Sequence, residues 1–153
     1  MKQDMTLRLF ESYCAVIRNS VGTEMFRNLY VSDGDTVKDI MDDGEFSCAF
    51  FVSSVLALFG YMQKPRATVD SVYEDLKKSG WGEVSEPVEG SILFWDEIFF
   101  EGDGLHAHVG FYIGDEQAIS NDYKSGKVTQ HHWTFDGKRE VKAILWKEDI
   151  QKT

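Results

Sequence analysis

The hydrophobic period of the chain changes near its middle, and this change restricts the fold more than any other feature. In the first half, apolar residues recur at helical spacing over residues 7–17, from about Ser47 to Phe59, and over residues 69–76. The second half contains short runs rich in β-branched and aromatic residues: Ser91–Trp95, His108–Ile113, Gln117–Asn121, Val128–Phe135 and Val141–Trp146. Their short connections predict an antiparallel meander with the helices packed on it, an α+β fold.

Length and charge set the class of protein and exclude several partners. A chain of 153 residues is the size of one domain, and no repeat or low-complexity tract divides it. The 26 acidic side chains outnumber the 16 Lys and Arg, for a net charge of −10. Such a surface repels nucleic-acid phosphates and anionic lipid, so we expect neither as a partner. The acidic segment 31–45, "VSDGDTVKDIMDDGE", reads as a loop.

Targeting and redox signals are few. The first residues mix charged with apolar side chains, without the continuous apolar region of a signal peptide, and no run approaches a membrane span. We therefore expect a cytoplasmic protein, with export by a phage-type or specialised secretion route left open. In a reducing compartment, the two cysteines, Cys14 and Cys48, are expected to be free thiols.

Cys48 stands at the predicted start of the apolar helix, within "GEFSCAFFVSSVLALFG". Ser47 is a suitable N-cap, and the helix dipole favours a thiolate at the first helical residue. Free N–H groups of that turn can also hold an oxyanion. The alternative is simple packing, because free cysteine is among the most buried residue types. The nearby Asp42, Asp43 and Glu45 raise a thiol pKa, so a nucleophile here needs a positive neighbour, for which we expect a histidine.

The segment "HAHVGFYIG" supplies that histidine. Alternation along a strand places His106, His108 and Gly110 on one face, and residues 109, 111 and 113 on the core face. Glycine inside a strand often marks the close approach of another backbone. The helix that carries Cys48 would fit there, which predicts an activated Cys48–His108 pair.

The strand after this segment supplies a third polar group beside the imidazole. An odd-length hairpin loop places Ser120 and Asp122 on the His108 face, whereas an even-length loop places Asn121 there. Either way, a polar side chain can hold the tautomer of the ring. Ser120 and Asn121 are the main candidates and Asp122 is the third.

Metal binding is the rival interpretation of the histidines. His106 and His108, together with the adjacent His131 and His132, lack the spacing of known zinc sites, so we expect no metal and no cofactor. Only one of His131 and His132 can point inward from a strand, and each is expected to be a rim or partly buried residue.

Three blocks, "FSCAFFVSSVL", "SGWGEVSEPVEGSILFW" and "HAHVGFYIGDEQAIS", together resemble the NlpC/P60 family of papain-like cysteine peptidases. The resemblance implies a single divergent NlpC/P60 domain over residues 1–153, with an N-terminal helix in 1–22 and a catalytic core in 44–146. It implies a papain-like fold with helices packed on an antiparallel five- or six-stranded sheet. Cys48 falls on the nucleophile and His108 on the general base. Ser120 falls on the third polar position, with Asn121 as its alternative.

The resemblance also implies a function. We expect a cysteine amidase or peptidase, a hydrolase that cleaves an amide bond through a thioester. Its substrate would be a peptide or a peptidoglycan fragment from a cell wall. The family usually reads Asp-Cys-Ser-Gly around the nucleophile, where this chain has Ser47-Cys48-Ala49-Phe50, so the substrate stays open. A catalytically inactive binding module and a thiol acyltransferase are the alternatives, and the oligomeric state is undetermined.

Overall fold

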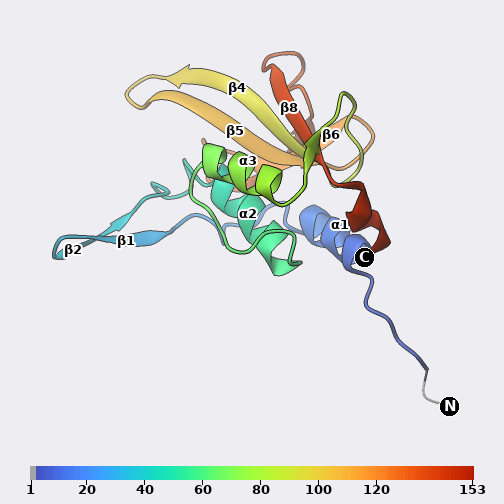
Figure 1. Ribbon diagram of the computed structural model, residues 1–153. Helices are drawn as coiled ribbons and strands as arrows, with labels where there is room; N and C mark the ends of the chain where they lie inside the picture. Colours follow the sequence, from blue (N-terminus) through green and yellow to red (C-terminus); the bar gives the residue numbers. More distant parts are fainter. Residues whose placement is uncertain (1–2) are drawn as a thin grey trace.

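The computed structural model describes residues 3–153 as a mixed α+β fold (Figure 1). Its helices and strands follow one another along the chain as α1 Leu9–Asn19, β1 Tyr30–Asp33, β2 Thr36–Asp39, α2 Cys48–Leu58, α3 Val69–Lys78, β3 Gly82–Glu83, β4 Ile92–Phe100, β5 Gly104–Tyr112, β6 Gln117–Asn121, β7 Val128–His132, β8 Val141–Trp146 and the 3-10 helix η1 Glu148–Lys152. The expected combination of helices with an antiparallel sheet is confirmed.

The main sheet has six strands in the order β3-β8-β4-β5-β6-β7, and all its pairings are antiparallel. Strands β4 to β7 form the expected meander, but β8 does not continue it. Instead, β8 returns to pair with the free edge of β4, where Leu93 lies opposite Ile144. Ile92 and Leu93 point to opposite faces and both are fully buried, so packed layers cover both faces of β4.

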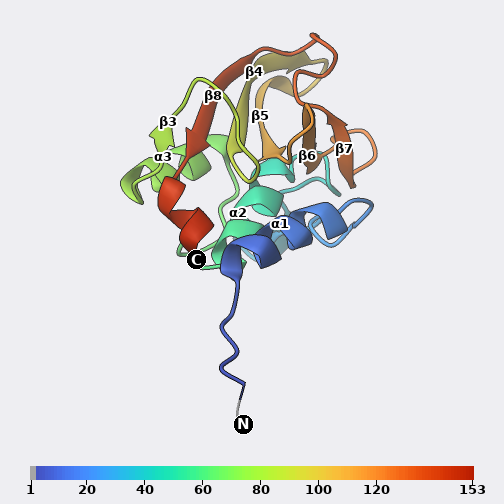
Figure 2. The ribbon, with the colours of Figure 1, turned by 90° about the vertical axis from the view of Figure 1, so that its right-hand side faces the viewer.

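Both faces of the sheet are covered. Helix α2 is apolar around most of its circumference, and Phe51, Val52 and Leu56 pack into the main core with Val109 and Phe111 of β5. Figure 2 shows α1 and α2 beneath the sheet. A smaller cluster on the other face contains Leu93, Trp95, Ala118 and Ile144, with Trp133 and Phe135 packed against it.

The acidic segment predicted as a loop contains a β-hairpin, so that prediction was wrong in part. Strands β1 and β2 pair through a two-residue turn in which Gly34 has a positive φ of 63°, and the hairpin projects from the body of the protein (Figure 1). Most of its side chains are exposed, so it leaves little apolar alternation in the sequence. At its base, the Asp39 carboxylate accepts hydrogen bonds from the backbone N–H groups of Leu29, Met41 and Asp43.

The N-terminal helix is shorter than the predicted range of residues 1–22. It begins at Leu9, residues 3–8 are not helical, and residues 1 and 2 lie outside the described part of the chain. Within residues 3–153, no helix combines the length and the apolar content needed to cross a membrane.

Candidate active site

Strands β5 and β6 pair over only part of their length, and the candidate site lies where they separate. Strand β5 pairs with β4 from Gly104 to Phe111, with a register shift between Trp95 and Ile98. Its register with β6 covers only Phe111 and Tyr112, opposite Ile119 and Ala118. Helix α2 contacts both β5 and β6. The Asn121 side chain donates a hydrogen bond to the Gly44 carbonyl at 2.8 Å, which ties the loop before α2 to β6. Asn121 thus supports this loop, and its side chain does not bind the His108 ring.

Cys48 is the first residue of α2 and is half-buried. Burial raises the pKa of its thiol, whereas the backbone N–H groups of Val109 and Ala49 and the Arg139 guanidinium favour the thiolate. The sequence attributed a raised pKa to Asp42, Asp43 and Glu45, but burial is the main cause. We expected the positively charged neighbour of Cys48 to be a histidine, but it is Arg139.

Ser47 occupies the N-cap position of α2 without capping the helix. Its backbone lies at φ −87° and ψ 1° rather than in the extended region, and its side chain makes no cap hydrogen bond. The Ser47 hydroxyl is buried and has no hydrogen-bond partner within residues 3–153. The predicted hydrogen bond to the Ser47 side chain was therefore wrong. The Ser47 hydroxyl accepts no hydrogen bond from the first-turn N–H groups of α2, which lie beside the Cys48 sulfur.

His108 belongs to a chain of three side chains. Its Nε2 lies 2.9 Å from Ser120 Oγ, which lies 2.7 Å from His131 Nε2, and His131 Nδ1 lies 2.8 Å from the His132 carbonyl oxygen. A carbonyl can only accept, so His131 carries its proton on Nδ1 and its Nε2 accepts from the Ser120 hydroxyl. Ser120 Oγ must then accept a hydrogen bond from the Nε2–H of His108, which leaves His108 Nδ1 as the basic nitrogen.

Burial keeps this base neutral. The His108 ring packs against Trp95 and Phe135, and its pKa lies well below the usual value because of burial, with further contributions from the Arg139 guanidinium and His131. The pKa of His131 is also lowered, mainly by burial. At neutral pH both rings are therefore uncharged, as the hydrogen-bond chain requires.

Gly110 marks the close approach of another backbone, as expected, but that backbone belongs to β6 and not to α2. A Cβ at this position would lie 2.8 Å from the Ile119 oxygen, 2.8 Å from Ser120 Cβ and 3.0 Å from the Trp95 ring. The close neighbours are thus β6 and Trp95, not the helix that carries Cys48. Helix α2 packs on the opposite, apolar face because that face offers Val109 and Phe111.

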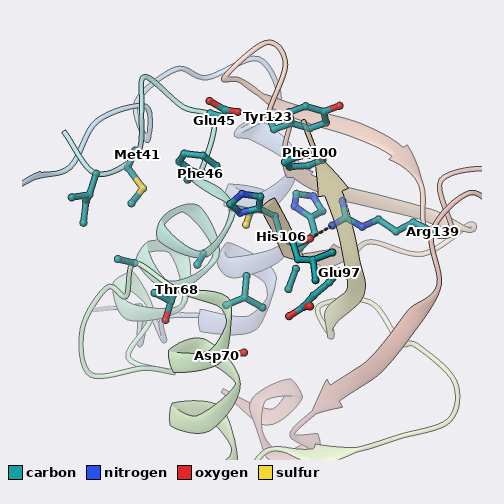
Figure 3. Close-up of a pocket in the computed structure, with 18 residues that line it drawn as sticks. Met41, Glu45, Phe46, Thr68, Asp70, Glu97, Phe100, His106, Tyr123 and Arg139 are labelled. Carbon is teal, nitrogen blue, oxygen red and sulfur yellow. Dashed lines mark hydrogen bonds between the residues drawn. The ribbon is translucent and has the colours of Figure 1, made fainter. Parts of the chain in front are cut away.

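Cys48 and His108 nevertheless line one cavity of about 440 Å³, which also contains Arg139 (Figure 3). Phe46, Phe100 and Tyr123 gather on one side of it, where His106 stacks between Phe46 and Phe100 at centroid distances of 4.8 and 5.2 Å. Within residues 3–153, no hydrogen bond joins the Cys48 sulfur to the His108 ring. Cys48 and His108 therefore line the same cavity but are not hydrogen-bonded to each other.

Arg139 is a member of the site that sequence reasoning missed. It lies just before β8 and reaches into the cavity, where its Nε donates to the Asp96 carbonyl at 3.0 Å and its Nη2 to the His106 carbonyl at 2.8 Å (Figure 3). The only available signal was the Lys-Arg pair in "FDGKRE", a cationic turn in an acidic chain.

The remaining polar candidates differ in whether they join the hydrogen-bond chain of His108 and Ser120. His131, expected to be a rim or partly buried residue, is partly buried and hydrogen-bonded to Ser120, whereas the His132 Nδ1 binds Thr134. The Asp122 carboxylate accepts from the Ser125 N–H. Across residues 3–153, no three His, Cys, Asp or Glu side chains are grouped to hold a metal ion.

The fold resembles that of a protein with a known structure. NlpC2 from Trichomonas vaginalis matches with a TM-score of 0.54 and 14% identity, over 94% of this chain and 48% of that one. This chain thus spans about half the length of the protein it matches. No family profile and no curated protein matches the sequence. At this identity, the likeness concerns the fold alone, which is NlpC-like.

Proposed function

We propose that this protein is a cysteine amidase or peptidase of NlpC/P60 type, which cleaves an amide bond through a thioester. One observation carries the proposal: a neutral His108, oriented by Ser120 and His131, shares a cavity with a thiol at the start of a buried helix. A base that presents a free nitrogen near a nucleophile is the arrangement that activates thiols for acyl transfer. The NlpC-like fold supports it.

The reaction begins with two uncharged partners. With substrate in the cavity, His108 Nδ1 removes the Cys48 thiol proton as the sulfur attacks the amide carbonyl carbon. The Cys48 backbone N–H stabilises the negative oxygen of the tetrahedral intermediate. His108 then gives the proton to the departing amine, the C–N bond breaks and a thioester remains. Water, deprotonated by His108, attacks the thioester and releases the acid and the thiol.

The hydrogen-bond chain stabilises the His108 ring when it becomes protonated. The Nε2–H of the ring donates to Ser120, whose hydroxyl donates to His131, so each bond strengthens when the ring becomes positive. Burial and Arg139 oppose that charge. Ser120 and His131 are thus positioning residues, and the Cys–His hydrogen bond forms around a substrate or reagent that the thiol attacks.

Thiol labelling tests the proposal. We expect iodoacetamide at neutral pH to label Cys48 at least ten times faster than Cys14, because Cys14 is buried in the core and burial raises its pKa to about 12. His108→Ala should remove most of this difference, whereas the control His132→Ala should preserve it. Peptide mapping by mass spectrometry assigns the labelled residue.

Hydrolysis completes the test. Peptide amides, including γ-D-glutamyl-diaminopimelate fragments, are incubated with the protein and with Cys48→Ser, and cleavage is expected only with the former. Slow, equal labelling of both thiols without cleavage would instead indicate a binding module. Products that incorporate an added amine at the expense of water would indicate an acyltransferase.

A further inference from the structure

We propose that Arg139 is a catalytic residue, whose guanidinium binds the negative oxygen that forms when the Cys48 sulfur attacks a carbonyl carbon. This inference rests on the proposed function. It adds a side-chain donor to the Cys48 backbone N–H, which stabilises the same oxygen. Arg139 precedes β8, Cys48 begins α2 and His108 lies on β5, so three separate elements supply the site.

An irregularity between β4 and β5 holds the guanidinium in place. The register of the two strands shifts between Trp95 and Ile98, and Asp96 lies within this shift. Arg139 Nε donates to the Asp96 carbonyl at 3.0 Å, and its Nη2 donates to the His106 carbonyl at 2.8 Å. Because carbonyls on two neighbouring strands bind the guanidinium, its position is fixed before a substrate arrives, as stabilisation of an oxyanion requires.

The Arg139 side chain keeps N–H groups for a ligand. A guanidinium presents its donors in a rigid fork, of which the two backbone bonds use only part. Within residues 3–153, this side chain makes no other hydrogen bond and no ion pair, although other arginines form such pairs. Arg139 lines the cavity that contains Cys48 and His108 (Figure 3), and no other lysine or arginine does so among the described residues. An oxygen that becomes negative in this cavity therefore meets one cationic donor.

The charges of Arg139 and Cys48 act on each other. Burial raises the pKa of the Cys48 thiol and lowers that of Arg139, whereas the Coulomb attraction between the two groups has the opposite effect on each. The carbon that the sulfur attacks carries the oxygen, so the negative charge stays near Arg139 as it moves from sulfur to oxygen. Arg139 also disfavours a positive His108. Coulomb energy falls with distance, so direct contact with the oxygen outweighs repulsion from a ring to which Arg139 is not hydrogen-bonded.

Two reagents that differ in whether a negative oxygen forms test the inference. Iodoacetamide alkylates the Cys48 sulfur as iodide leaves, and no oxyanion forms. With p-nitrophenyl acetate, the sulfur attacks the carbonyl carbon, the thiol proton passes to His108 and the carbonyl oxygen becomes negative. The C–O bond then breaks, p-nitrophenolate leaves with the bonding electrons, and Cys48 is acetylated. Changes in the thiolate fraction affect both rates, so they cancel in the ratio of acetylation to alkylation, measured by mass spectrometry of the Cys48 peptide.

We expect Arg139→Met to lower this ratio at least about tenfold relative to the parent protein. Lys138→Met, which removes an exposed cation from the same turn, should keep the parent ratio. Tyr123→Phe removes a hydroxyl that also lines the cavity, and it should keep the ratio as well. Arg139→Lys retains the positive charge without the fork, so its ratio should fall at least about threefold. This second variant carries the test if urea unfolding shows that Arg139→Met is not folded.

The outcomes separate this inference from the proposed function. A parent ratio in either Arg139 variant, with Cys48 still reactive, would overturn the role of Arg139 and leave the amidase standing. A ratio that falls in Tyr123→Phe but not in Arg139→Met would overturn it in the same way. If Cys48 of the parent protein reacts with neither reagent, the proposed function fails and the inference fails with it.

Discussion

Replacing Gly110 by alanine should disturb both the stability of the sheet and the hydrogen bond that orients His108. The added Cβ would lie 2.8 Å from the Ile119 oxygen and from Ser120 Cβ, and 3.0 Å from the Trp95 ring. Two of these neighbours belong to strand β6 and the third to a buried indole, so none can move at little cost. Overpacking of this kind costs about 1–3 kcal/mol. Loss of glycine entropy in the unfolded chain returns only about 0.4–1 kcal/mol.

Urea unfolding measures the stability change, and the rate of Cys48 labelling by iodoacetamide measures the effect on the site. Gly82→Ala is the matched control, because Gly82 has no atom within 4 Å of its added Cβ and no positive φ. We expect the control to lie within about 0.5 kcal/mol of the parent. If Gly110→Ala is as stable as Gly82→Ala and labels at the parent rate, the close packing of β5 against Ser120 is refuted.

Two further predictions concern single buried groups. Ser47→Ala should leave stability unchanged or raise it by up to about 1 kcal/mol, because it removes a buried hydroxyl without a partner. A loss of about 1 kcal/mol in urea unfolding would instead indicate that the Ser47 hydroxyl caps α2. The second concerns acid. His108 has a native pKa well below 6.5, so below about pH 6.5 the unfolded state binds a proton that the native state refuses. The free energy of unfolding should therefore decrease as the pH is lowered, by up to about 1.4 kcal/mol per pH unit. His108→Gln should make this dependence weaker between pH 7.5 and 5.5. An equal dependence in the variant would contradict a neutral His108 ring.

The sequence predicted the elements that are rich in buried apolar residues. Helix α2 and strands β6 and β8 lie where periodicity placed them, because their apolar faces are buried against neighbouring layers. The β1–β2 hairpin was missed because its side chains face water and its strands carry as much charge as a loop. The return of β8 to β4 was missed because strand order depends on which edge is free, and periodicity does not encode that.

The candidate site was predictable in part, for a related reason. Cys48, His108 and Ser120 stand in recognisable local patterns, and Ser120 does lie beside His108. Asn121 points to Gly44 because alternation along β6 turns it to the other face. Arg139 and His131 enter through long-range packing of the β7–β8 region, which no local spacing reveals.

The separation between β5 and β6 has a consequence for synthesis of the protein on the ribosome. Cys48 emerges well before His108, and the residues that orient or flank the His108 ring, Ser120, His131 and Arg139, follow later still. Their neighbourhood exists only after the helices dock onto a completed sheet. A nascent chain therefore carries an isolated Cys48 thiol without the residues proposed to activate it, and the proposed activity arrives only with the finished fold.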